Sequence, residues 1–307
     1  MSRFTGLVAP PHTPFGPHGA VDPGRIEAQA RHVAASGAAA VFVGGTNGEC
    51  HSLSTEEREL VAARWLELAP ECGLRVIVHV GCNCLPDAVR LARHARGRGA
   101  DAIAAMAPCY FKPVDVAALV EFLTPIAAAA PETPFYYYHI PAMTGVRLSV
   151  PELLRAGAER IPTLRGAKYT CDDLLEYRRC VELDGGRFDC LLGFDRGLLA
   201  GLEVGARGAV GSTYNFAAPL FVRLIAAFEA GDMESARRDQ LRAEELIAIL
   251  GRHDFRPACK ALMAMIGVDC GPVRPPLRQL SEAACAELRA ELEAIGFFRW
   301  SRPAAGA

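Results

Sequence analysis

Short apolar segments alternate with longer segments of helical periodicity along most of the chain. Eight segments rich in Val, Ile, Ala or aromatic residues are centred near Leu7, Val41, Val78, Ile103, Tyr137, Gly166, Leu191 and Ala209. Successive centres lie roughly 18 to 37 residues apart, which leaves room for one helix and a right-handed crossover between parallel strands. Eight such units within about 215 residues predict a closed (β/α)8 barrel rather than an open doubly wound sheet.

The pattern changes after the eighth apolar segment. From about Pro219 to Gly296 the chain has the periodicity of several helices, and Ser281 is placed to cap one of them in "SEAACAELRAELEAIG". No linker rich in proline or serine separates this part from the rest. We therefore expect a barrel catalytic domain over residues 1–218 and a C-terminal helical extension packed on it over residues 219–307.

The composition favours a small-molecule partner. The chain has 307 residues, 51% of them hydrophobic, and its net charge of -2 comes from interspersed basic and acidic residues without a basic stripe for nucleic acid. No apolar run is long enough to span a membrane, and the first residues lack the features of a secretion signal. Eleven cysteines, an odd number, are typical of reduced thiols. We expect a cytoplasmic protein with no nucleic-acid or membrane partner.

Two motifs suggest a metal or a cofactor only weakly. Cys82 and Cys84 in "GCNC" follow His79, but no second pair of ligands with zinc-like spacing follows, so small core or loop residues are the better interpretation. The segment "GARGAVGS" has the glycine spacing of a dinucleotide-binding turn. It lacks the acidic ribose partner and the following βαβ unit, so we expect no NAD.

The segment "VGGTNGEC" places three glycines at the end of the second expected strand. Gly44, Gly45 and Gly48 allow a tight turn whose backbone N–H groups point inward, and the Thr46 hydroxyl adds a donor. Such a turn can hold a carboxylate or a phosphate. A glycine turn without a ligand is the alternative, because such turns are common after barrel strands.

Lysine is scarce in this chain. Lys112, Lys168 and Lys260 are its only lysines, and Lys168 lies near the end of the sixth expected strand among apolar and aromatic residues. Desolvation there would lower the pKa of its amine and allow attack on a carbonyl, which arginine cannot perform. A surface lysine just past a strand is the alternative. Lys112 is expected in a loop, and Lys260 on the face of a helix.

Three consecutive tyrosines end the fifth expected strand. Side chains alternate along a strand, so Tyr136 and Tyr138 face one side and Tyr137 the other. Tyr138 is nearest the carboxyl end, where its phenol could shuttle protons for a substrate bound to the neighbouring strand. Aromatic packing between barrel and helices is the alternative, and it accounts for at least one of the three.

Taken together, the motifs resemble those of a family of pyruvate-dependent class I aldolases, which includes dihydrodipicolinate synthase and N-acetylneuraminate lyase. The resemblance rests on "GGTNGE", "YYYHIPAMTGV", "GAKYT" and "GARGAVGSTYN", and it covers nearly the whole chain. It implies a TIM barrel, a lysine Schiff base to the pyruvyl part of a 2-oxo acid, and a homotetramer built from tight dimers. Within the family, "YYYHIPAMTGVRLS" and "GSTYNF" are most similar to the lyase branch.

The resemblance also implies roles for individual residues. By position, Lys168 forms the Schiff base, Tyr138 transfers the proton, and Thr46 supports that phenol. Thr46 and Asn47 meet the substrate carboxylate, and Tyr110 in "APCYF" matches a tyrosine that the family contributes across the dimer interface. By similarity with the lyases, the sugar-acid part of the pocket is lined by Thr170, Gly193, Asp195 and Ser212.

Three positions differ from one branch of the family or the other. Met143 stands where the synthase branch carries an arginine that holds a second carboxylate. Asn47 follows Thr46 where the lyases carry a second hydroxyl residue, and its amide can still donate to a carboxylate. Arg196 follows Asp195 where the lyases place an acid for the polyol tail. A cation there suits a carboxylate or a phosphate better than a glycerol chain, although arginines at loop mouths are usually solvated.

The residues and the resemblance together predict a retro-aldol lyase. It would cleave a 4-hydroxy-2-oxo acid to pyruvate and an aldehyde, with Lys168 as the electron sink, and would require neither a metal nor an organic cofactor. One alternative is a dehydratase or aldolase of the same family that acts on a different, dicarboxylic 2-oxo acid, which Arg196 favours. Another is a non-catalytic barrel that senses a sugar acid.

Overall fold

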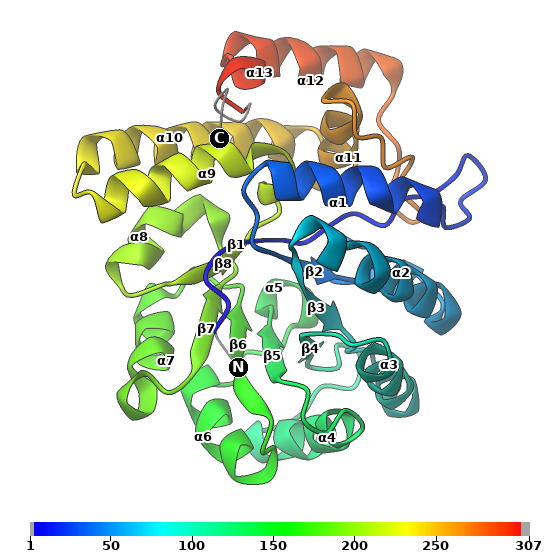
Figure 1. The fold of residues 1–307 in the computed structure, drawn as a ribbon, viewed down its shortest axis with the longest axis vertical. Helices are drawn as coiled ribbons and strands as arrows, with labels where there is room; N and C mark the ends of the chain where they lie inside the picture. The colour runs from blue at the N-terminus through cyan, green and yellow to red at the C-terminus, as the bar shows by residue number, and fades with distance from the viewer. Residues whose placement is uncertain (1–2, 302–307) are drawn as a thin grey trace.

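The computed structural model describes residues 3–301 as a closed barrel of parallel strands surrounded by helices (Figure 1). The strands follow chain order around the barrel, and β8 pairs with β1 to close it. Each of the eight apolar segments contains one strand, which confirms the predicted (β/α)8 architecture. The strands are β1 (Gly6–Ala9), β2 (Ala40–Val43), β3 (Arg75–His79), β4 (Ala102–Met106), β5 (Phe135–His139), β6 (Leu164–Tyr169), β7 (Asp189–Leu192) and β8 (Gly208–Val210).

Helices connect the strands and continue beyond them. The longer helices are α1 (Ile26–Ala35), α2 (Thr55–Leu68), α3 (Leu85–Gly97), α4 (Val116–Ala128), α6 (Val150–Arg160), α7 (Leu174–Gly186), α9 (Tyr214–Glu229), α10 (Met233–Arg252), α11 (Phe255–Met265) and α12 (Glu282–Ala294). The short ones are α5 (Pro141–Thr144), α8 (Leu198–Glu203) and α13 (Phe297–Trp300). Four 3₁₀ turns, η1 (Pro23–Arg25), η2 (Cys50–Ser52), η3 (Pro70–Cys72) and η4 (Asp195–Gly197), lie in the connections.

Local sequence explains several of these boundaries. Ser54 caps α2 with a capping box, in which Glu57 bonds back to the Ser54 N–H. Ser281 accepts a hydrogen bond from the Ala284 N–H and caps α12, as predicted. Gly166 lies opposite Asp189 in the β6–β7 pairing, and a Cβ at this glycine would collide with the Asp189 carbonyl. Glycine therefore permits the close strand pairing that sets the register of β6.

The barrel strands divide their side chains between two hydrophobic clusters. The inner cluster fills the barrel and includes Phe42, Met106, Tyr136, Tyr138 and Val210, while Tyr137 belongs to the outer cluster between strands and helices. This division follows from the alternation of side chains along a strand. The tyrosine trio therefore faces both sides of the barrel wall, with two phenols inside it.

The C-terminal helices gather on one side of the barrel. α10 packs along α9, and α11, α12 and α13 lie beyond them, at the yellow to red end of the chain (Figure 1). The predicted division between residues 218 and 219 falls inside α9, and the division into two parts stays a prediction. The outer ends of both predicted parts, residues 1–2 and 302–307, lie outside the described residues.

Within residues 3–301, no helix combines the length and the apolar character needed to cross a bilayer. The same residues hold no group of three or more His, Cys, Asp or Glu side chains with the arrangement of a metal site. Cys82 donates to the Cys84 carbonyl over 3.0 Å, and the buried His79 ring contacts the Gly44 carbonyl at 2.9 Å. Cys82 therefore bonds within the "GCNC" segment, and His79 bonds to the turn after β2.

Candidate active site

A cavity of about 250 Å³ opens at the carboxyl ends of the strands. Its walls come from the turn after β2, the ends of β5 and β6, the loops after β7 and β8, and the start of α11. Residues singled out from the sequence that line it are Thr46, Asn47, Tyr138, Met143, Lys168, Thr170, Gly193, Asp195 and Ser212. With Pro10, which follows β1, side chains from six strand ends therefore meet in one space, as expected for a barrel of this type.

Lys168 projects from β6 into the barrel interior. Its exposed fraction is 4%, and Nζ lies 4.0 Å from the ring centroids of both Phe42 and Tyr138. Burial lowers the pKa of the Lys168 amine to about 7, although the thiol of Cys50 and the carboxylate of Asp195 act in the opposite direction. A substantial fraction of this amine is therefore neutral and nucleophilic near neutral pH.

Tyr138 lies beside this lysine because the two residues pair across β5 and β6. Its hydroxyl is 3.0 Å from the Thr46 hydroxyl, and either group can be the donor. Burial raises the pKa of the Tyr138 phenol, so it carries its proton in the unliganded site. The arrangement joins a buried amine, a phenol and a hydroxyl in one chain of groups.

The turn after β2, which lines the cavity with Thr46 and Asn47, keeps several backbone donors without a partner among the described residues. Gly44 has φ +68°, a Cβ at Gly45 would press on the Phe42 ring, and Glu49 is left-handed with φ 53°. In the described part of the chain, the N–H groups of Gly45 to Gly48 donate to no carbonyl or side chain. Successive unpaired N–H groups beside the Thr46 hydroxyl form a nest suited to a carboxylate.

The amide of Asn47 ties this turn to two other loops. Its Nδ2 donates to the Pro10 carbonyl over 3.3 Å, and its Oδ1 accepts from the Ser212 hydroxyl over 3.1 Å. Both ends of the amide are thus bonded within the protein. Asn47 and Ser212 line the cavity and also fix its shape.

The loops after β6 and β7 form the opposite wall. Asp195 Oδ2 accepts from the Thr213 hydroxyl over 2.7 Å and from the Thr213 N–H over 3.1 Å. A Cβ at Gly193 would collide with the Thr170 side chain, so glycine leaves room for this hydroxyl residue. The Asp195 carboxylate is held in a fixed orientation beside the cavity.

Three predicted residues occupy less central places. Met143 lines the cavity but is 54% exposed. Arg196 is exposed and does not line the cavity, while its carbonyl accepts from Gln240 and its N–H donates to Asp195. Tyr110 is 78% exposed, lies outside the cavity and stacks edge-on against Phe111. The roles predicted for these side chains stay predictions.

The sequence interpretation missed two contributions from α11. Phe255 and Arg256 line the cavity from this helix, far along the chain from Ser212, the last residue singled out for the pocket. No local signal distinguishes Arg256 from the many other arginines of the chain. Its placement depends on how the C-terminal helices pack against the barrel.

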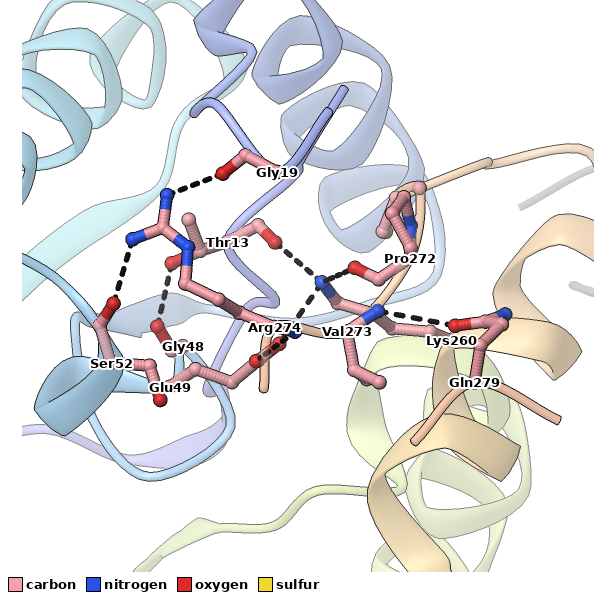
Figure 2. Close-up of polar contacts among 12 residues, drawn as sticks. Thr13, Gly19, Gly48, Glu49, Ser52, Lys260, Pro272, Val273, Arg274 and Gln279 are labelled. Carbon is pink, nitrogen blue, oxygen red and sulfur yellow. Dashed lines mark hydrogen bonds and ion pairs between the residues drawn. The ribbon is translucent and has the colours of Figure 1, made fainter. Parts of the chain in front are cut away.

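Lys260 lies on helix α11, as expected, and its side chain belongs to the buried face of that helix. Its side chain is 1% exposed, and Nζ donates to the carbonyls of Thr13 over 2.8 Å and Pro272 over 2.7 Å (Figure 2). Nζ also forms an ion pair at 3.0 Å with Glu49 Oε1, without the alignment of a hydrogen bond. A lone lysine in the apolar segment "PACKALM" was the signal available in the sequence.

This ion pair supports the carboxylate-binding turn from behind. Glu49 Oε2 accepts from the Arg274 N–H over 2.9 Å, and the Thr13 hydroxyl donates to the Gly48 carbonyl over 2.7 Å. Figure 2 shows Glu49 from the turn after β2, Thr13 from the loop after β1 and Pro272 from the segment after α11, all beside Lys260. The C-terminal helices therefore help to hold residues 44–49 in place.

The whole chain is similar to known lyases. Residues 3–295 match the model of the dihydrodipicolinate synthetase family. The N-acetylneuraminate lyase of Gallus gallus is 40% identical over 297 residues, with 95% of this chain and 96% of that protein covered. The solved structures of N-acetylneuraminate lyases from Proteus mirabilis and Aliivibrio salmonicida each superpose with a TM-score of 0.94. The Proteus mirabilis protein is 38% identical, and the match covers 96% of this chain and 100% of that one. The Aliivibrio salmonicida protein is 40% identical, and the match covers 97% of this chain and 98% of that one.

The lowered pKa of Lys168 predicts a specific pH profile for its reactivity. Because the neutral amine reacts, acetylation of Lys168 should accelerate about tenfold per pH unit below its pKa of about 7 and then level off. Competitive labelling followed by peptide mass spectrometry measures this curve, with the exposed Lys112 as the reference for reagent decay. A Lys168 curve that still rises steeply above pH of about 9 would contradict the assignment.

The buried ion pair predicts an asymmetric response to mutation. Lys260→Met leaves the Glu49 carboxylate buried without its cation, so the free energy of unfolding should fall by about 3–5 kcal/mol. In the double variant Glu49→Gln/Lys260→Met both charges are gone, and most of that loss should be recovered. Denaturant titration measures these values, with Lys112→Met as a control expected within about 0.5 kcal/mol of the parent. A single variant as stable as this control would show that the pair is unimportant.

Proposed function

Because the chain belongs to the dihydrodipicolinate synthetase family, we propose that it cleaves a 4-hydroxy-2-oxo acid through a Schiff base on Lys168. The chain is a class I, pyruvate-dependent carbon–carbon lyase, and pyruvate and an aldehyde are its products. The observation that carries the assignment to Lys168 is its burial between the Phe42 and Tyr138 rings, with its pKa lowered to about 7. Lys112 is exposed, and Lys260 is committed to Glu49 and two carbonyls.

The proposed first step joins the enzyme to the substrate. The neutral Lys168 amine attacks the C2 carbonyl, water leaves, and an iminium forms. The C1 carboxylate occupies the nest of N–H groups at Gly45 to Gly48, beside the Thr46 hydroxyl. This carboxylate fixes the orientation of C2, so the substrate approaches the amine in one way.

The proposed second step breaks the carbon–carbon bond. The Tyr138 phenol gives its proton to the C2 hydroxyl that leaves as water in the first step, and the positive iminium beside the ring stabilises the resulting phenolate. This phenolate then accepts the proton of the C4 hydroxyl. As that proton leaves, C4 becomes the aldehyde carbon, and the C3–C4 electron pair moves into the iminium to give an enamine. Protonation of the enamine at C3 and hydrolysis release pyruvate and regenerate the amine. The Thr46 hydroxyl holds the phenol in place throughout.

N-acetylneuraminate is the reference substrate for this proposal, since relatives of about 40% identity bear the name N-acetylneuraminate lyase. Thr170, Gly193, Asp195 and Ser212 would then face the sugar-acid part. A second candidate is an aldolase or dehydratase reaction on a dicarboxylic 2-oxo acid, which the arginine among the cavity-lining residues favours. A sugar-acid sensor without catalysis would bind such compounds and release no pyruvate.

We also propose a homotetramer built from tight dimers. Tyr110, Phe111 and Val114 are 78%, 84% and 87% exposed, and so many exposed apolar side chains on one loop favour an interface. Tyr110 would then reach the site of a partner subunit. A cytoplasmic location also remains a proposal, and the eleven cysteines, all free thiols, are typical of a reducing compartment.

Reductive trapping tests the covalent step. Borohydride treatment in the presence of pyruvate should attach one pyruvyl group to each chain, and peptide mapping should locate it on Lys168. Lys168→Met should abolish both the trapping and the release of pyruvate from a panel of 4-hydroxy-2-oxo acids that includes N-acetylneuraminate. Labelling on Lys112 or Lys260 instead would refute the role of Lys168.

Removing the Tyr138 hydroxyl tests the proton transfer. Tyr138→Phe should still form the trapped imine with pyruvate, while the rate of cleavage falls by about 10²- to 10⁴-fold, because a positioned acid–base group is lost. Tyr137→Phe is the matched control, since its ring belongs to the outer cluster and does not line the cavity. Equal cleavage rates in the two variants would assign Tyr138 to packing alone.

A further inference from the structure

Arg256 places a cation at the cavity without a protein counter-ion. Its side chain comes from α11 and lines the cavity beside Phe255 and Met143. Within residues 3–301 it forms no ion pair, and its guanidinium donates only to the Met143 sulfur, 3.7 Å from Nη2. Thioether sulfur is a weak acceptor, so the donors of this guanidinium are available to a ligand.

The acidic residue of the cavity lining, Asp195, is bonded to other groups and does not pair with Arg256. Asp195 is the acidic residue of that lining, and its carboxylate accepts from the Thr213 hydroxyl, the Thr213 N–H and the Arg196 N–H. No ion pair joins it to Arg256 within residues 3–301. Apolar residues of the same lining include Ala142, Met143 and Phe255, and Met143 contacts Arg256.

The position of Arg256 suits the part of the substrate that leaves. Arg256, Met143 and Thr46 also line a neighbouring, largely apolar cavity of about 290 Å³, so the guanidinium lies where the two cavities meet. The free N–H groups of the turn after β2 and the Thr46 hydroxyl already supply donors for one carboxylate. A second anionic group would find its partner at Arg256.

We propose that Arg256 determines specificity by binding a carboxylate on the aldehyde part of the substrate, a proposal that rests on the proposed retro-aldol function. The planar guanidinium can hold this carboxylate with two parallel hydrogen bonds. The preferred substrates are 4-hydroxy-2-oxo acids with a second carboxylate beyond C4. Arg196, the cation suggested by the sequence, is exposed outside the cavity and is not required for this recognition.

Aldehydes matched in shape provide the test in the condensation direction, which passes through the same transition state. In each of two pairs an isopropyl group replaces a carboxylate of similar shape: glyoxylate against isobutyraldehyde, and 4-oxobutanoate against 4-methylpentanal, each combined with pyruvate. Because the members of a pair also differ in intrinsic reactivity, the comparison of the parent with Arg256→Met decides the outcome. The parent should prefer at least one anionic member by about 10- to 150-fold in kcat/KM, the effect of a charge-assisted hydrogen-bonded pair. Arg256→Met should remove this preference and leave the neutral aldehydes unaffected, and Arg256→Lys should restore part of it.

Two further variants separate Arg256 from general effects of charge. Arg237→Met removes one positive charge from the exposed face of α10 and should keep the parent preference. Arg196→Met should also keep it, and loss of preference in this variant but not in Arg256→Met would overturn the proposal. A second outcome would also overturn it: Arg256→Met lowers kcat/KM equally for all aldehydes and also weakens the trapping of pyruvate. Arg256 would then bind the C1 carboxylate.

Failure of this proposal is distinguishable from failure of the proposed function. If pyruvate is trapped on Lys168 and the neutral aldehydes condense, the retro-aldol chemistry stands whatever the preference. If the parent then shows no preference for either anionic aldehyde, Arg256 does not recognise a carboxylate. If no pyruvate is trapped on Lys168 in any variant, the proposed function itself is wrong.

Discussion

The site depends on the burial of one amine. An ammonium group loses its hydration inside the barrel, so burial favours the neutral form of Lys168 and lowers its pKa to about 7. The Phe42 and Tyr138 rings, each with its centroid 4.0 Å from Nζ, offset only part of that cost, because a desolvated cation–π contact contributes about 2 kcal/mol or somewhat more. The close pairing of β6 with β7 at Gly166 sets the register that directs this side chain inward. A lysine on the outer face of the same strand would stay charged.

The turn after β2 imposes the second constraint. Its N–H groups are free only while residues 44–49 keep a conformation with two left-handed residues, Gly44 and Glu49, and a non-glycine residue adopts that conformation at a cost. Burying the Glu49 carboxylate would add a further cost without a cation beside it. Lys260 supplies that cation from α11, so the helices after the barrel stabilise an element formed by its second strand.

The sequence predicted features that depend on local periodicity and missed those that depend on tertiary packing. Eight apolar runs, spaced far enough apart for a crossover helix between them, are sufficient to predict the barrel. The alternation of side chains along a strand is sufficient to predict that Tyr138 faces inward and Tyr137 outward. Arg256 approaches the cavity only because α11 folds back on the barrel, which no pattern near residue 256 encodes. Arg196 illustrates the same limit, since its position next to Asp195 did not reveal that its side chain lies outside the cavity lining.

The site has two parts, one formed by the barrel and one formed by a helix outside it. The amine, the phenol and the free N–H groups lie on strand ends and one turn, where the register of the barrel fixes them relative to one another. Arg256, the group proposed to contact the departing aldehyde, belongs to a helix outside the barrel, as does the cavity-lining Phe255. A substitution on that helix can change the charge of the outer wall without altering the pairing of β5 with β6 that sets Tyr138 beside Lys168. Substrate preference can therefore differ between family members that share the reacting groups, and a likeness in overall fold does not fix the aldehyde.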